Sequence, residues 1–147
     1  MKLTTRGRYG SRLMVDLALH YGAGPVLLKD IASRQEISEK YLGQMIKPLK
    51  SAGLINASRG AHGGYFLAKP PGEITIAEVL FAVEDDLNLV ECVANQSICS
   101  RNERCAIHDV WCDLSDEVKN ILNSITLQDL SDRQRQKQTS QPLMYYI

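Results

Sequence analysis

The sequence has no cysteine outside the segment from Cys92 to Cys112, few aromatic residues and no long apolar run. Aromatic residues are only 6% of the total, which predicts a mainly aliphatic core. The charged segment Met1 to Arg8 is not followed by an apolar stretch of signal or membrane length. These absences predict a cytoplasmic protein that has no membrane segment and folds without disulfides.

The net charge of zero conceals an uneven distribution along the chain. Residues 1–70 contain 11 Lys and Arg against 4 Asp and Glu, a net charge of +7. Residues 71–147 contain 6 against 13, a net charge of −7. The first half is therefore expected to face a polyanion. Charge alone leaves open the plainer alternative, two solvated faces of one domain.

Apolar spacing predicts three helices in the first half, over about Thr5 to Tyr21, Leu28 to Gln35 and Glu39 to Ser51. Ser38 precedes the third helix as an N-cap. Pro48 predicts a kink or a local break near the end of that helix, because proline deletes one backbone hydrogen bond. The inward positions of the third helix recur every three or four residues: Leu42, Met45, Ile46 and Leu49.

Two short β-prone runs follow, at residues 54–58 and 65–68. Three glycines within residues 59–64 permit the positive φ angles of a hairpin turn. Three helices and a two-stranded hairpin predict a mainly α fold with a small β-hairpin wing, a winged helix-turn-helix domain over residues 1–72. In such domains the third helix enters the major groove of DNA.

The predicted DNA contacts lie on the outer side of the third helix and at the hairpin tip: Ser38, Lys40, Tyr41, Gln44, Lys47, Lys50, Arg59 and His62. The lysines would neutralise phosphates, Ser38 and Tyr41 would donate hydrogen bonds to them, and Gln44 would pair with an adenine edge. A single lysine of this kind is more often merely solvated. Several beside a glutamine, in the basic half of the chain, favour DNA binding.

The second half begins with a predicted helix over about Thr75 to Glu84 and continues into a loop that contains the cysteines. A long helix over about Ile107 to Ile125 follows, with an apolar stripe that either packs on the first domain or pairs with a second copy. Residues 73–132 are thus interpreted as the metal-binding loop and a C-terminal dimerisation helix. The polar residues 131–138 are expected to fray, and residues 133–147 to form a polar tail.

Cys92, Cys99, Cys105 and His108 are separated by gaps of six, five and two residues. Such closely spaced thiols and an imidazole suit an iron-sulfur cluster or zinc. Zinc sites usually have tighter pairs of ligands, so the wider gaps favour a cluster. Cys112 is open to three interpretations: a fourth thiolate, a resolving thiol or a small buried side chain.

Five segments together resemble the IscR-type iron-sulfur regulators of the bacterial Rrf superfamily, over about residues 1–132. They are Met1 to Tyr9, Ile37 to Leu42, Gly53 to Gly60, Gly63 to Tyr65 and Ile125 to Leu127. The resemblance implies a homodimer paired through the long helix.

The resemblance also implies a 2Fe-2S cluster on the four residues Cys92, Cys99, Cys105 and His108. The first gap is one residue longer than in IscR, and related sensors bind 4Fe-4S clusters, so that 4Fe-4S is the alternative. Gly43 replaces a glutamate that helps IscR distinguish two kinds of DNA site, which predicts a simpler on-off switch.

The leading hypothesis is therefore a homodimeric regulator of transcription that binds double-stranded DNA at a palindromic operator under control of a bound iron-sulfur cluster. The alternative within the same fold is a cluster-free regulator that uses thiols or a partner protein, for example in cysteine metabolism. A small electron carrier would leave the basic first half unexplained. The acidic residues near the cysteine loop suit a solvated rim better than paired catalytic carboxylates, so no enzyme is expected.

Overall fold

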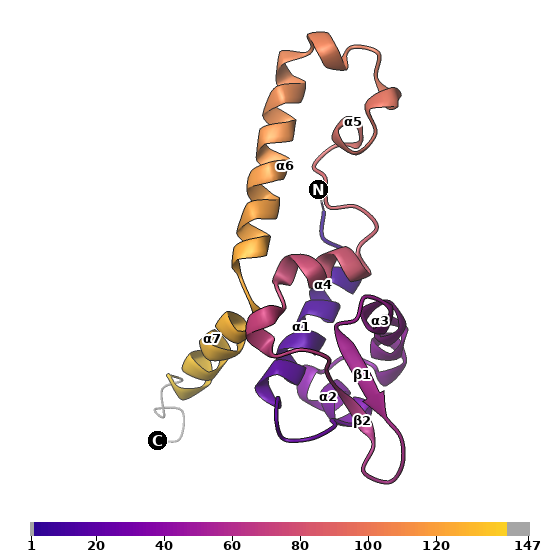
Figure 1. The fold of residues 1–147 in the computed structure, drawn as a ribbon, viewed down its shortest axis with the longest axis vertical. Coiled ribbons are helices and arrows are strands. Elements are labelled where there is room, and N and C mark those ends of the chain that lie inside the picture. Colours follow the sequence, from indigo (N-terminus) through magenta and orange to yellow (C-terminus); the bar gives the residue numbers. More distant parts are fainter. Residues whose placement is uncertain (1, 141–147) are drawn as a thin grey trace.

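The computed structural model describes residues 2–140, and Figure 1 shows a helical body from which a long arm projects. We call residues 2–87 and 125–140 the body, and residues 88–124 the arm. The elements in chain order are α1 (Thr5–Leu19), α2 (Leu28–Gln35), α3 (Glu39–Ser51), β1 (Ile55–Ser58), β2 (Gly64–Leu67), η1 (Pro71–Glu73), α4 (Ile76–Val83), α5 (Glu91–Ala94), η2 (Gln96–Ile98), η3 (Asn102–Arg104), α6 (Ala106–Ser124) and α7 (Leu127–Thr139). The predicted fold class, mainly α with a small hairpin, is confirmed.

The sequence supplies an N-cap side chain at four helices of the body. Thr4 caps α1, Ser38 caps α3, and Thr75 and Thr126 form capping boxes at α4 and α7. Burial alone would raise the pKa of Glu78, the partner of Thr75. Hydrogen bonds from the Thr75 backbone N–H and from Lys69 outweigh that effect and lower the pKa below its usual value.

The core of the body is aliphatic, as the low aromatic content predicts. Its buried members come from the α-helices of the body and from both strands, and the fully buried ones include Leu13, Ile31, Leu49 and Val79. The four predicted inward positions of α3 are all buried. The helix runs through Pro48 to Ser51 without the predicted break, because the proline lies in its last turn and side-chain packing holds both sides.

A buried carboxylate joins α1 to α2. Asp16 of α1, only 1% exposed, accepts hydrogen bonds from both Nε and Nη2 of Arg34, at 3.0 and 2.7 Å. It also accepts one from Nε2 of Gln35 at 2.9 Å. The hydrogen bond to Asp16 raises the pKa of Arg34, which stays charged. This paired charge holds the first half of the helix-turn-helix against α1.

The hairpin pairs β1 with β2 in antiparallel register, from Ile55 opposite Leu67 to Ser58 opposite Gly64. β1 begins one residue later than predicted, and β2 has the predicted length but begins and ends one residue earlier than predicted. At Gly63 a Cβ would overlap the backbone carbonyl of Ser58, so the turn requires glycine there. Tyr65 exchanges two backbone hydrogen bonds of 2.8 Å with Val26, which attaches the hairpin to the loop between α1 and α2.

The end of the chain differs from expectation. The residues predicted to fray, 131–138, lie within α7, which is helical to Thr139 and packs on α1. Leu127 is fully buried and Ser131 nearly so, and a backbone bond of 2.9 Å from Leu127 N–H to the Ile74 carbonyl fixes the start of the helix. Tertiary packing therefore orders a helix whose surface is mostly polar.

The predicted tail begins at residue 133, inside α7, and its last residues, 141–147, lie outside the described part of the chain. Across residues 2–140 no helix combines the length and the apolar character needed to cross a membrane.

Candidate DNA-contact face and cysteine arm

The turn between α2 and α3 presents α3, the predicted recognition helix, with its polar side outward. Glu36 adopts a left-handed conformation (φ 55°), Ile37 is buried, and the Ser38 hydroxyl accepts a hydrogen bond of 3.1 Å from the Tyr41 N–H. The cap occupies an acceptor lone pair of Ser38 and leaves its hydrogen free to donate to a phosphate. The outward positions of α3 are all exposed: Lys40, Gly43, Gln44, Lys47 and Lys50.

Tyr41 differs from the other predicted contacts because it is half-buried. Its ring meets Tyr9 of α1 edge-on, with centroids 5.5 Å apart and planes at 82°. The guanidinium groups of Arg8 and Arg12 lie 5.8 and 5.7 Å from the centre of the Tyr9 ring.

Sequence reasoning did not assign these arginines a role at the DNA-contact face. Two cations four residues apart on one helix were a visible signal. Only the packing of Tyr9 on Tyr41 shows that they stand beside the recognition helix.

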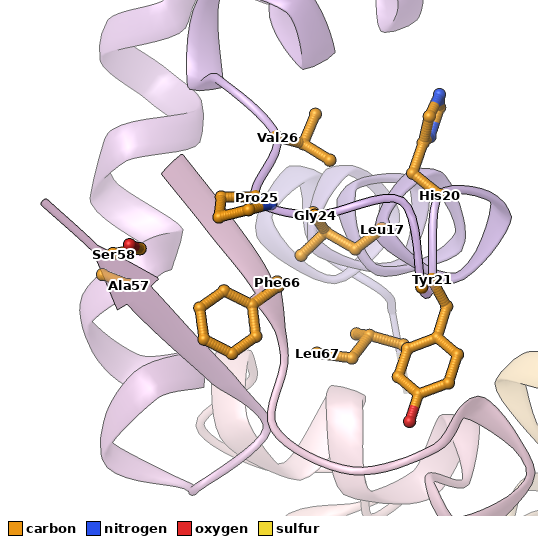
Figure 2. A pocket seen from close by; sticks show the side chains of 11 residues that line it. Leu17, His20, Tyr21, Gly24, Pro25, Val26, Ala57, Ser58, Phe66 and Leu67 are labelled. Atoms are coloured by element: carbon orange, nitrogen blue, oxygen red, sulfur yellow. The ribbon is translucent and has the colours of Figure 1, made fainter. Parts of the chain in front are cut away.

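Arg59 and His62 are exposed at the tip of the hairpin, where the sequence placed them. Beside the hairpin lies a mostly apolar groove of about 640 Å³, between the end of α1, the following loop and the strands (Figure 2). Tyr21 and Phe66 contribute its aromatic side chains. Its histidine, His20, donates through Nδ1 to the Asp16 carbonyl at 2.8 Å and is thus engaged in the body.

The arm pairs an ascending segment, residues 88–105, with the descending helix α6 (Figure 1). Polar contacts join the two: Nζ of Lys119 donates to Asn88 at 2.9 Å, and the Leu89 N–H donates to the Ser115 hydroxyl at 3.4 Å. The only buried residues within residues 88–124 are His108 and Ser115, both polar. The arm has no apolar core of its own.

The apolar stripe of α6 lies open to solvent. Val110 is 44% exposed, Leu114 45% and Ile121 57%. Leu122, further along the helix, and Ile125, the residue after its end, pack against the core of the body. The sequence left two alternatives for the stripe, packing on the first domain or pairing with a second copy. Packing on the first domain is seen only at this end of α6.

His108 is the predicted ligand that the fold holds most firmly. Its Nε2 donates to the Cys92 carbonyl oxygen at 3.2 Å, and the sulfur of Cys112 lies 3.8 Å from both ring nitrogens. A neutral imidazole that donates through Nε2 keeps its free lone pair on Nδ1. The fold thus brings His108, the Cys92 backbone and Cys112 together.

Cys92, Cys99, Cys105 and Cys112 are free thiols of intermediate burial. Within residues 2–140, no three Cys, His, Asp or Glu side chains lie close enough together to hold a metal ion. The donor set nevertheless fits an iron-sulfur cluster in kind, because it offers accessible thiols and one imidazole on a single segment. Binding would require the loop around Cys99 and Cys105 to bring its thiols toward His108.

Cys112 has an environment that disfavours a thiolate. Desolvation, followed by the charges of Asp116, Asp109 and Asp113, raises the pKa of its thiol. A protonated thiol is a poor metal ligand and a poor nucleophile. The structure therefore favours the interpretation of Cys112 as a small packing residue beside His108.

An exposed basic recognition helix, a hairpin beside it and a thiol-bearing arm define a winged-helix regulator of transcription that binds DNA. The chain belongs to the Rrf2 family, described as iron-dependent transcriptional regulators, whose sequence pattern matches residues 3–133. This confirms the predicted resemblance and the expectation of a regulator rather than an enzyme.

Two relatives illustrate the similarity in sequence. The HTH-type transcriptional regulator IscR of Photorhabdus laumondii is 43% identical over 134 residues, which cover 91% of this chain and 81% of that protein. Protein rrf2 of Nitratidesulfovibrio vulgaris is 43% identical over 130 residues, 88% of this chain and 87% of that protein.

Two solved structures share the fold. CymR, the global cysteine regulator of B. subtilis, superposes with a TM-score of 0.80 at 38% identity, over 90% of this chain and 98% of its own. T. potens IscR superposes with a TM-score of 0.78 at 38% identity, over 99% and 97%. The proteins similar to this chain thus include regulators named IscR and one described as a global cysteine regulator.

Proposed function

We propose that this regulator binds a palindromic operator as a homodimer and that an iron-sulfur cluster in the arm controls its affinity for DNA. The observation that carries the proposal is the separation of the two regions. The DNA-contact face belongs to a body with a closed aliphatic core, whereas the thiols belong to an arm with no apolar core. A ligand that orders the arm can therefore act without disturbing the fold of the body.

Cys92, Cys99, Cys105 and His108 would hold the cluster, which is 2Fe-2S in the first instance and 4Fe-4S as the alternative. When bound, such a cluster supplies a centre that responds to redox state, iron supply or nitric oxide. The protein's own contribution is to hold His108 buried against Cys92, so that one ligand is positioned before the others converge. The relatives named IscR support this assignment.

The homodimer follows from the stripe on α6. Large apolar side chains spaced along one exposed face are unfavourable in water and suit a two-fold contact with the same helix of a second copy. A two-fold axis would also present two recognition helices to a palindromic site. Each α3 would place its lysines against phosphates and Gln44 against a base edge, with Arg59 and His62 reaching the flanking groove.

A second candidate, control by bare thiols or a partner protein, is favoured by one specific observation. The described cysteines do not converge on a metal site, and the fold is as similar to a cysteine regulator as to an IscR. In that case the thiols would respond to oxidation, and the DNA-contact face would be unchanged.

The deciding experiment is anaerobic purification followed by visible and Mössbauer spectra. Operator affinity is then measured at fixed salt without oxygen for the iron-loaded protein, the metal-free protein and Cys105→Ala. We expect a coloured protein whose affinity differs from the other two by about 5-fold to 150-fold, which corresponds to coupling of about 1 to 3 kcal/mol. Cys112→Ala is the matched control. A colourless protein with one bound zinc, or three equal affinities, would contradict cluster control.

A further inference from the structure

The end of α4 lies against the first turn of α1. Glu84, the residue after α4, accepts hydrogen bonds from the backbone N–H and the hydroxyl of Thr4, at 2.8 and 2.9 Å. Thr4 is the N-cap of α1, and its hydroxyl accepts from the Gly7 N–H at 3.4 Å. The carboxylate thus lies at the positive end of a 15-residue helix, where negative charge is favourable. The hydrogen bonds of Glu84 therefore join the start of α1 to the end of α4.

Two glycines make this close approach possible. A Cβ at position 7 would overlap the Glu84 carboxylate, and one at position 10 would lie 3.3 Å from Val83 and 3.4 Å from the Met45 sulfur. Both glycines have ordinary helical backbone angles, so the shortage of space is what favours glycine. At this point α1, α4 and the recognition helix α3 meet.

The same part of α1 contacts both helices of the helix-turn-helix. Tyr9, two residues after Gly7, meets Tyr41 of α3 edge-on. Arg12 donates from Nε to the side-chain oxygen of Gln35 in α2 at 3.2 Å, and from Nη2 to the Gln35 carbonyl. A shift of the first turns of α1 would therefore move contacts to α2 and α3 together.

Glu84 is also close to the arm along the chain. Leu87 is buried in the core of the body, and the next residue, Asn88, accepts the hydrogen bond from Lys119 of α6. Three residues thus separate Glu84, whose carboxylate lies at the start of α1, from Asn88, which makes the first contact within the arm. The hydrogen bonds between Glu84 and Thr4 thus lie close to the point where the arm leaves the body.

We propose that Glu84 is a positioning residue for DNA recognition: held by Thr4 in the space left by Gly7, it sets Tyr9 against Tyr41 and so fixes the recognition helix relative to the root of the arm. The inference rests on the proposed function for the DNA-contact face. It assigns Glu84 no contact with DNA or with a cluster.

Three variants and one control test the proposal in the metal-free, full-length protein. Glu84→Ala removes the acceptor, whereas Glu84→Gln keeps an oxygen that the Thr4 N–H can donate to. Gly7→Ala displaces the Glu84 carboxylate, although alanine favours the helical conformation of α1. An effect of this variant therefore comes from the position of Glu84 and not from a less stable helix. Asp85→Ala removes the neighbouring exposed carboxylate and is the matched control.

Two measurements are made on each variant. Hydrogen exchange is followed over residues 39–51, and affinity is compared between a duplex selected by the wild-type protein from a random library and a scrambled duplex. Glu84→Ala and Gly7→Ala should speed exchange in α3 and lower the ratio of the two affinities by about 5-fold to 150-fold, the effect of misplacing a base contact. Affinity for the scrambled duplex should stay near the wild-type value. Glu84→Gln should restore most of the ratio.

The outcomes separate the two hypotheses. If Glu84→Ala and Gly7→Ala match Asp85→Ala in both measurements, the positioning role is wrong, even if their melting temperatures fall. If wild-type protein does not distinguish the two duplexes but exchange in α3 still rises in both variants, the proposed DNA-contact face fails and the positioning role stands. If Glu84→Ala does not fold, Gly7→Ala decides.

Discussion

The body and the arm use the same kinds of residue in opposite ways. In the body, α1 and α3 bury their apolar stripes, and the large hydrophobic side chains of the core are closed off from solvent. In the arm, α6 has a comparable stripe, but Leu114 and Ile121 remain exposed while His108 and Ser115 are buried. Amphipathic patterning alone therefore does not identify what a helix packs against.

The difference between the two regions indicates that the body provides stability and that the arm is the region open to regulation. The body closes its core within one chain, so it can present a DNA-contact face on a rigid frame. The arm is held to itself mainly by hydrogen bonds, which contribute about 1 kcal/mol each after exchange with water. Such a region can be ordered or reorganised by a second subunit or a bound ligand at small energetic expense to the rest.

The strongest way to break the comparison is to place a charge on the exposed stripe. Leu114→Glu or Ile121→Glu should give monomers or insoluble protein, because a carboxylate buried without a partner in an interface costs about 3 to 5 kcal/mol. Analytical ultracentrifugation measures the mass, and circular dichroism should show that the body stays folded. Asn123→Glu, about 200° around the helix from Ile121, is the control. A wild-type protein that is monomeric at micromolar concentration would contradict the proposed dimer contact through α6.

A truncation inside the body should act on stability instead. Leu127→Ala should lower the free energy of unfolding by about 2 to 5 kcal/mol, because Leu127 is fully buried where α7 joins the core. Urea denaturation measures the loss, with the exposed Gln128→Ala as control. An equal, small effect of both changes would mean that α7 is not part of the body.

The DNA-contact face predicts two different responses within one helix. Gln44→Ala should relax preference at one base position, at about 1 to 3 kcal/mol. Lys47→Ala should weaken binding to every sequence and reduce the slope of log K against log salt by about 0.9. Titrations at several salt concentrations measure both, with the exposed Lys137→Ala on α7 as control. Unchanged operator binding in both variants would show that α3 is not the recognition helix.

The smallest effect is expected in the arm, at Cys112. Its raised thiol pKa and its place beside His108 predict that Cys112→Ala keeps the colour of the protein and its operator affinity, with a stability change of about 1 kcal/mol or less. Absorbance, DNA titration and thermal melting measure the three quantities. Loss of colour would make Cys112 a ligand and the proposed set incomplete.

Most of the body could be predicted from the sequence. The bounds of α2 and α3 agree with prediction to the residue, because apolar spacing, the Ser38 cap and the turn before it indicate the same boundaries. Residues 131–138 were misjudged because their own polarity predicts fraying, whereas burial of Leu127 and contact with α1 hold α7 in place. Pro48 does not break α3, because a proline in the last turn interrupts little.

The sequence by itself determined the amphipathic helices, the glycine turns, the basic outer side of α3 and the grouping of the thiols on one segment, because each depends on neighbours a few residues apart. Only the tertiary structure decided that Arg8 and Arg12 lie against the ring of Tyr9, which in turn packs on Tyr41 of α3. It also decided that His108 is buried against Cys92 and that Glu84 occupies the space at Gly7. These contacts join residues that are distant in the chain. Their geometry depends on how whole helices pack, which local patterns do not encode.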